Sequence, residues 1–170
     1  IQYLTRAEVP ELMALISGMI FANATVIISS QFVLLKLMAR FSLTQRIQVG
    51  LVLLALSQVW MCLNPVSAFW GWIGAVIIMS VAEAILFPTM NVQIDRLAPS
   101  QLKGAYFGAA SFYSIGYAVA PFGGGIILDS LGGPWVFAIG SVLILAVMYL
   151  YYILHRMPRP DFDGLLTDNN

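Results

Sequence analysis

The stretch that decides the fold is SAFWGWIGAVIIMSVAEAILFPTMNV, residues Ser67–Val92, which carries a single charged side chain, Glu83. A bilayer hydrocarbon core about 30 Å thick is crossed by a helix of about 20 apolar residues. Backbone N–H and C=O groups find no water in that core, so such a segment has to be helical. Ser67–Val92 is therefore predicted to be a transmembrane helix.

Four other apolar segments pass the same test on either side of it. Their starts carry signals typical of helix N-termini, such as Pro10 ahead of Glu11, or Ser42 followed three residues later by Gln45 in a capping-box pattern. The predicted spans are Pro10–Met38, Thr44–Leu63, Ser67–Val92, Leu102–Leu128 and Pro134–Leu154. The predicted fold class is thus an all-α integral membrane protein with five transmembrane helices.

Outside this bundle of residues 10–154, we expect residues 1–9 to form an external loop and residues 155–170 to form a disordered polar tail. The chain begins at Ile1 with no basic segment ahead of a short apolar run, so we expect no signal peptide. We interpret the chain as part of a longer polypeptide.

Composition excludes several classes of protein. The chain of 170 residues is 60% hydrophobic and 9% charged, with eight basic and eight acidic side chains. These charges are too few to cover a soluble domain or to neutralise a nucleic acid backbone. The single cysteine, Cys62, belongs to no Cys/His pattern typical of a zinc site, so we expect neither a metal nor a cofactor.

Basic residues indicate how the helices are oriented, because Lys and Arg accumulate in cytoplasmic loops. Arg6 lies on one side of the predicted membrane. The other side carries Lys36, Arg40, Arg46, Arg96, Lys103, Arg156 and Arg159. The start of the chain is therefore predicted to lie outside and its carboxyl terminus in the cytoplasm, as in a multi-pass protein of a bacterial inner membrane.

Polar side chains within the spans are candidates for function. A polar side chain facing lipid is costly, so these residues should face a bundle interior or a water-filled cavity. Glu83 is the only carboxylate near the middle of a span, and it either handles a proton or ligand or hydrogen-bonds a neighbouring helix. For the amides of Asn23, Gln31, Gln58 and Asn91, hydrogen bonds between helices are the favoured interpretation.

The fourth span is marked by small residues at helical spacing. Gly104 and Gly108 are four residues apart, as are Gly116, Ala120 and Gly124, which predicts tight packing against other helices. A leucine at Gly124 is accordingly expected to disturb packing. Pro121 lacks a backbone donor, so we expect a kink or a flexible point there.

The region from the third span to the fifth has an ordered series of motifs. They are Glu83-Ala-Ile-Leu-Phe-Pro88, Asn91, Asp95-Arg-Leu-Ala-Pro99, Lys103-Gly-Ala-Tyr-Phe-Gly108, Gly116, Ala120-Pro-Phe-Gly-Gly124, Asp129, Gly132 and Trp135. This series resembles the major facilitator superfamily, and it is most similar to the drug:proton antiporter branch. An acid in the third span and a polar tail after the last span favour the carboxyl-terminal half, helices eight to twelve.

The resemblance is weaker in two places. The loop motif expected between helices eight and nine is reduced here to Ala39–Arg46, which retains only its basic residues. A charge-relay role in gating therefore does not carry over to this loop. Lys103 stands where the family usually has arginine, which keeps the charge but loses the bidentate fork.

The resemblance implies a secondary transporter that works by alternating access, and no enzyme activity. Its implied partners are a small-molecule substrate, protons, the bilayer and the amino-terminal part of the same transporter. The expected activity is proton-coupled efflux of lipophilic or cationic drug-like compounds, with an uptake symporter or a metabolite exporter as alternatives. A membrane anchor or an integral-membrane enzyme is the alternative outside transport, although the chain shows no cluster of reactive side chains at one membrane face.

Site residues follow from the same resemblance. Proton coupling or substrate binding is expected at Glu83, Asn23, Gln31, Asn91, Ser111 and Tyr113. Gating or helix packing is expected at Gly104, Gly108, Gly116, Pro121, Gly123 and Gly124.

Overall fold

The computed structural model describes residues 1–7, 9 and 11–157 of the chain, and all regular secondary structure in these parts is helical. Five of its helical segments are long and apolar enough to cross a membrane. The helices of the described residues are α1 (Gln2–Arg6), α2 (Leu12–Met38), α3 (Leu43–Leu63), α4 (Phe69–Leu97), α5 (Lys103–Ala110), α6 (Tyr113–Ser130) and α7 (Gly133–Arg156). The predicted fold class of five membrane-spanning helices is confirmed.

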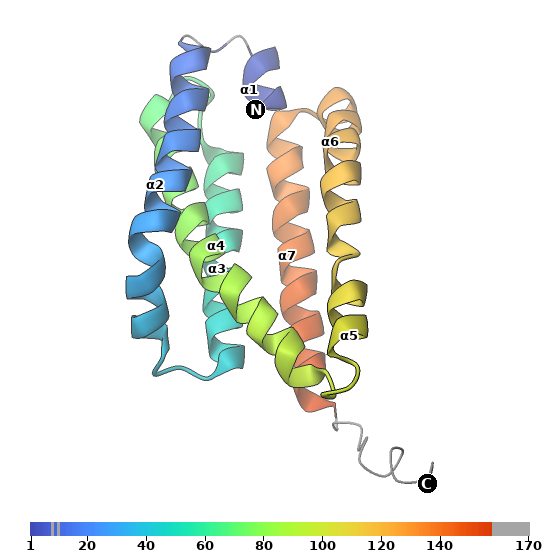
Figure 1. Ribbon diagram of the computed structural model, residues 1–170. Coiled ribbons are helices and arrows are strands. Elements are labelled where there is room, and N and C mark those ends of the chain that lie inside the picture. Colours follow the sequence, from blue (N-terminus) through green and yellow to red (C-terminus); the bar gives the residue numbers. More distant parts are fainter. Residues whose placement is uncertain (8, 10, 158–170) are drawn as a thin grey trace, which may run out of the picture.

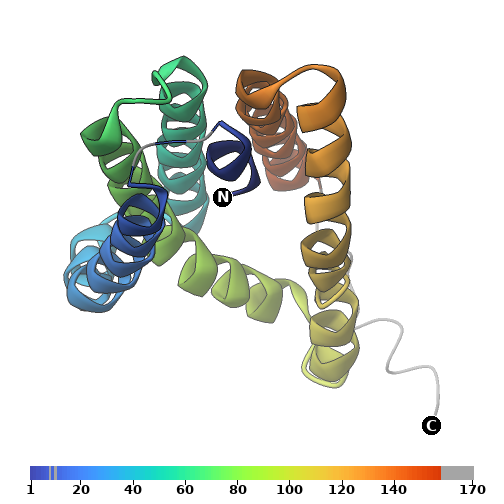
Figure 2. The ribbon, with the colours of Figure 1, turned by 90° about the horizontal axis from the view of Figure 1, so that it is seen from above.

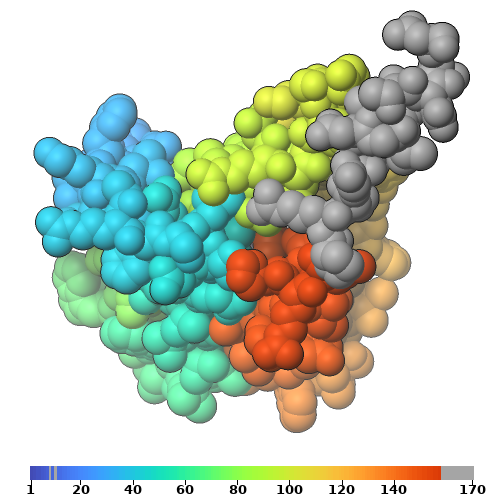
Figure 3. Space-filling model, turned by 90° about the horizontal axis from the view of Figure 1, so that it is seen from below, coloured from blue at the N-terminus to red at the C-terminus, as the bar shows by residue number. Residues whose placement is uncertain are grey.

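The helices form two neighbouring groups (Figure 1). In the first, α4 packs against both α2 and α3; in the second, α6 packs against α7, and α3 joins the groups by packing on α7. Viewed from below, α7 lies beside α3 (Figure 3). We call the end of the bundle where α1 lies the α1 end, and the opposite end, where α5 lies, the α5 end.

The segment predicted as an external loop contains the short helix α1, which lies between the two groups at the α1 end (Figure 2). Leu4 is only 2% exposed and belongs to a core cluster with Leu15 and Trp72. The Tyr3 ring meets Trp72 and Phe137 edge-on, with ring centroids 6.0 and 6.1 Å apart. These aromatic contacts hold the segment in a helical turn, so the loop prediction is wrong for Gln2–Arg6.

The fourth span also differs from its prediction. It is interrupted at Ser111 and Phe112, whose N–H groups donate to carbonyls three residues back, at 3.2 and 3.1 Å. The Ser111 hydroxyl donates to the Gly108 carbonyl at 2.6 Å, which competes with the regular helical ladder. By contrast, α6 continues through Pro121, where a kink or flexible point was expected.

Helix boundaries otherwise agree with the sequence within a few residues, except that α4 extends to Leu97. The capping box at the start of α3 is confirmed. Gln45 N donates to Ser42 Oγ at 3.3 Å, and Ser42 N donates to Gln45 Oε1 at 2.9 Å. In the predicted tail, His155 and Arg156 belong to α7, and residues 158–170 lie outside the described part of the chain.

The capping box leads to a prediction about stability. Ser42→Ala should lower the free energy of unfolding by about 1 kcal/mol, because it leaves the Gln45 N–H without its acceptor. Thermal unfolding of the variant in detergent checks this value. A Ser42→Asn variant, which keeps an acceptor at the cap, should stay close to wild type, and equal losses in both variants would contradict the prediction.

Candidate functional site

The candidate site lies where α2 and α4 cross, near the middle of both helices. Asn23 is close to the centre of α2, and Glu83 is the central residue of α4. Both side chains are half-buried. In a helix of this length and apolarity, the central residue lies deep in the hydrocarbon region.

Three side chains make up the polar cluster at this crossing. The Asn23 side-chain amide donates to Glu83 Oε2 at 2.9 Å and to Ser80 Oγ at 3.0 Å. The Ser80 hydroxyl in turn donates to the Val76 carbonyl, at 2.7 Å. Both amide protons of Asn23 are thus used, and Ser80 acts as donor and acceptor at once. We call Asn23, Ser80 and Glu83 the polar triad.

Ser80 was not among the candidates from the sequence. A serine three residues before a carboxylate lies on the same helix face, so the spacing of Ser80 and Glu83 was the available signal. Ser80 is fully buried, and it accepts its hydrogen bond from Asn23 of another helix. The spacing of residues within α4 could not predict that Asn23 lies next to it.

Electrostatics single out Glu83 within the triad. The described residues contain two ion pairs, Arg6 with Asp129 and Lys103 with Asp95, and Glu83 takes part in neither. Its carboxylate oxygen accepts one amide hydrogen bond, which leaves further lone pairs for a proton or a ligand.

The other predicted site residues lie apart from the triad. Gln31 is further along α2 and Asn91 is exposed on α4. Tyr113 is exposed on α6, where it lines an apolar groove of about 440 Å³ with Gly116, Tyr117, Ala120 and Pro121. Ser111 lies in the interruption before α6 and uses its hydroxyl on its own backbone. The structure brings together Asn23 and Glu83 from the predicted set.

The predicted packing glycines have open surroundings. A Cβ atom placed at Gly104, Gly108, Gly116, Gly123 or Gly124 would meet nothing within 4 Å in the described part of the chain. The tight packing expected for this span is therefore not found among the described residues. Close approach occurs instead at Gly50, where a Cβ would lie 2.6 Å from Leu86 Cγ, and at Gly71 and Gly133.

Basic side chains gather near the α5 end and have local roles there. Arg46 donates to the carbonyls of Phe41 and Ala39, at 3.1 and 3.3 Å, and so closes the turn after α2. Lys103 pairs with Asp95 at 2.6 Å across the connection from α4 to α5. The loop Ala39–Arg46, which lacks the family's loop motif, is thus stabilised by the hydrogen bonds of Arg46 and by the capping box.

Comparison with known proteins identifies the class. The sequence profile described as Major Facilitator Superfamily matches residues 13–166. The chain therefore belongs to the major facilitator superfamily, a family of membrane transporters rather than enzymes. As a member of this family, it is a multi-pass membrane protein, and the transporters of this class have small-molecule substrates.

Individual relatives support the same assignment. An uncharacterized MFS-type transporter of Bacillus subtilis, YqjV, is 31% identical over 144 residues, which cover 82% of this chain and 34% of the relative. The uncharacterized Escherichia coli MFS-type transporter YdeE is 36% identical over 81 residues, 48% of this chain and 20% of the relative. A Na(+), Li(+), K(+)/H(+) antiporter of Planococcus maritimus is 31% identical over 99 residues, 56% of this chain and 23% of the relative.

The match to YqjV spans about a third of that relative's length. No solved structure gave a significant match to the chain.

The triad leads to a prediction about packing. Asn23→Leu removes the amide that joins α2 to α4, and we expect it to lower the free energy of unfolding by about 1 kcal/mol. Thermal unfolding in detergent measures this loss. Gln31→Leu, on the same helix, is the matched control and should stay close to wild type. A loss in the control as large as in the variant would contradict the prediction.

Proposed function

We propose that this chain is part of the carboxyl-terminal half of a proton-coupled exporter of lipophilic or cationic compounds, most like the drug:proton antiporter branch of its family. The observation that carries the proposal is Glu83. It is a carboxylate at the centre of a membrane-spanning helix, held by the Asn23 amide and paired with no cation of the described residues. Such a group can exchange a proton for a cationic substrate during alternating access.

Two further observations support a cationic substrate exchanged for protons. The relative from Planococcus maritimus is named as an antiporter of alkali cations and protons. The exposed aromatic rings of Tyr113 and Tyr117, with centroids 6.0 Å apart, border the apolar groove on α6, and such rings suit an organic cation.

The open glycine face of α5 and α6 is a surface on which the amino-terminal part of the transporter can pack closely.

The same proposal includes an orientation. Lys36, Arg40, Arg96 and Arg156 lie near the α5 end together with Arg46 and Lys103, and Arg6 lies at the α1 end. By the positive-inside rule, the α5 end faces the cytoplasm and the start of the chain lies outside, in a bacterial inner membrane. Labelling of single cysteines at Ser67 and at Gln101 with a membrane-impermeant maleimide in intact cells checks it. Only the cysteine at Ser67 should react, and reaction at Gln101 alone would reverse the orientation.

Transport itself is tested in inverted membrane vesicles that contain the complete transporter. A respiration-driven pH gradient is followed with a fluorescent probe while a panel of lipophilic cations is added. Efflux by antiport predicts that a transported cation dissipates the gradient. If uptake coupled to protons or export of a metabolite is the true activity, the panel has no effect on the gradient, and the proposal is wrong.

A further inference from the structure

A second candidate site lies at the α1 end, away from the polar triad. A cavity of about 530 Å³ is lined there by Val9, Glu11, Ser67, Phe69 and Trp70. Its walls come from the residues just before α2 and from the connection between α3 and the start of α4. Its volume falls in the range of pockets that hold small organic molecules. We call it the entrance pocket.

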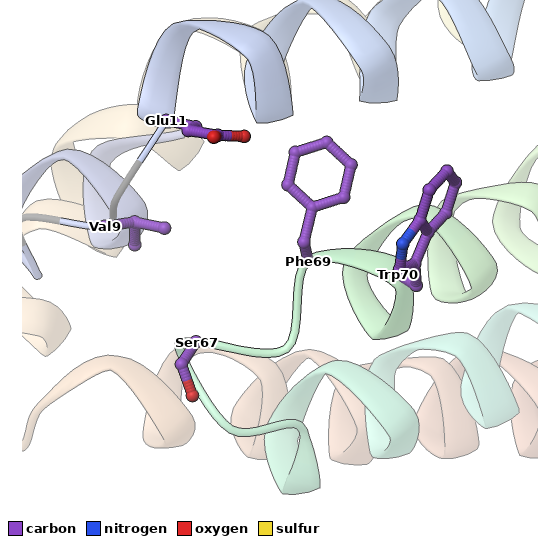
Figure 4. A pocket seen from close by; sticks show the side chains of 5 residues that line it. All are labelled: Val9, Glu11, Ser67, Phe69 and Trp70. Carbon is purple, nitrogen blue, oxygen red and sulfur yellow. The ribbon is translucent and has the colours of Figure 1, made fainter.

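The entrance pocket combines one carboxylate with two aromatic rings. Figure 4 shows the Glu11 side chain extending toward the Phe69 ring, with the Trp70 ring beyond it. Phe69 and Trp70 meet edge-on, with centroids 5.4 Å apart and an angle of 72° between the ring planes. Trp70 is 79% exposed and Glu11 is exposed too. Glu11 and Trp70 are therefore accessible to a ligand, whereas Phe69 is half-buried and packs against the core cluster of Leu15 and Trp72.

The charges around the pocket favour a cation. Glu11 takes part in neither of the two ion pairs of the described residues, and Arg6, the basic residue in the helix next to it, is occupied by Asp129. A carboxylate that shares a pocket with the rings of phenylalanine and tryptophan can recognise an organic ammonium ion. A single carboxylate with one hydroxyl supplies too few oxygen ligands to hold a small divalent metal ion.

Membrane anchoring accounts for only part of the pocket. Exposed tryptophans such as Trp70 and Trp135 are typical of the membrane interface. Anchoring does not require a carboxylate that extends toward the Phe69 ring, and Glu11 lies in the left-handed backbone region, with φ of 57°. We propose that the entrance pocket binds an organic ammonium group through Glu11, Phe69 and Trp70. This site is independent of Glu83.

The experiment uses the complete transporter in nanodiscs of phosphatidylglycerol, with choline as the probe. Choline binding is titrated through the saturation-transfer signal of its methyl protons. The neutral isostere 3,3-dimethyl-1-butanol, which has the same shape without the charge, should give no saturable signal. Glu11→Gln and Trp70→Leu should each weaken choline binding by about two- to fivefold, and the double variant should weaken it by about four- to 25-fold.

A matched control comes from the same end of the bundle. Trp135→Leu removes a second exposed tryptophan. Trp135 does not line the entrance pocket, so choline binding should be unchanged in this variant. The altered side chains of Glu11 and Trp70 are exposed, and the thermal midpoint of each variant shows that it is folded.

The lipid composition of the nanodiscs distinguishes two sources of the ammonium group, a lipid headgroup and a soluble cation. In nanodiscs that contain phosphatidylethanolamine, weaker choline binding identifies the lipid headgroup as an occupant, whereas unchanged binding identifies a soluble cation. Both results keep the site. Choline binding that is unaffected in the double variant, equal binding of the neutral alcohol, or the absence of choline binding in phosphatidylglycerol overturns the proposal.

Discussion

Glu83→Gln is expected to abolish substrate-driven proton movement while the protein remains in the membrane. The amide keeps the size of the side chain and can still accept a hydrogen bond from Asn23, so the contact between α2 and α4 is retained. It cannot bind and release a proton. In inverted vesicles, dissipation of the pH gradient by a transported cation should therefore fall to the level of vesicles without transporter.

A matched control separates coupling from a general effect of removing a carboxylate. Asp129→Asn makes the same chemical change at the end of α6, where the side chain is exposed and paired with Arg6. This variant should dissipate the gradient as wild type does. If Glu83→Gln still dissipates the pH gradient, the Glu83 carboxylate has a structural role. That role is the second interpretation from the sequence, a hydrogen bond to a neighbouring helix.

Gly50→Leu is expected to destabilise the contact between α3 and α4. Gly50 is buried against Leu86, whose Cγ and Cδ2 would lie 2.6 and 2.7 Å from an added Cβ. Leu86 is itself buried in a cluster with Ile47 and Leu51, so it has little room to move. Overpacking of this kind costs about 1–3 kcal/mol, which should lower the thermal midpoint measured in detergent.

Gly124→Leu is the matched comparison for that measurement. It was expected from the sequence to disturb packing, yet a Cβ at Gly124 meets nothing within 4 Å in the described part of the chain. Gly124→Leu therefore meets no steric conflict with the described helices. If the variant lowers the thermal midpoint of the complete transporter, the amino-terminal part packs against Gly124. A Gly50→Leu variant with a wild-type midpoint would contradict the structure at this contact.

The contrast between Gly50 and Gly124 shows what the sequence could and could not predict. Hydropathy alone located all five spans, because the bilayer imposes one length and one composition on any helix that crosses it. Small residues mark faces where close approach is possible, but the helix that approaches depends on the arrangement of the whole bundle. The four-residue spacing of Gly104 and Gly108 pointed to the fourth span, whereas Gly50 has no small residue four positions before or after it.

The candidate site was predictable in the same partial way. Asn23 and Glu83 stood out because polar side chains are rare in the middle of a span. Their hydrogen bond, and the part played by Ser80, depend on α2 crossing α4 at one particular point. The helix at Gln2–Arg6 was missed because its turn is stabilised by Trp72 and Phe137, which are distant in the sequence.

The most direct test of the central claim is proton release on substrate binding by the purified transporter. The complete protein is placed in unbuffered detergent solution near neutral pH with a pH indicator, and a transported lipophilic cation is added. If Glu83 exchanges its proton for the substrate, wild type releases protons and Glu83→Gln releases none while it still binds the cation. Equal proton release by both proteins would contradict the role of Glu83 as the coupling acid.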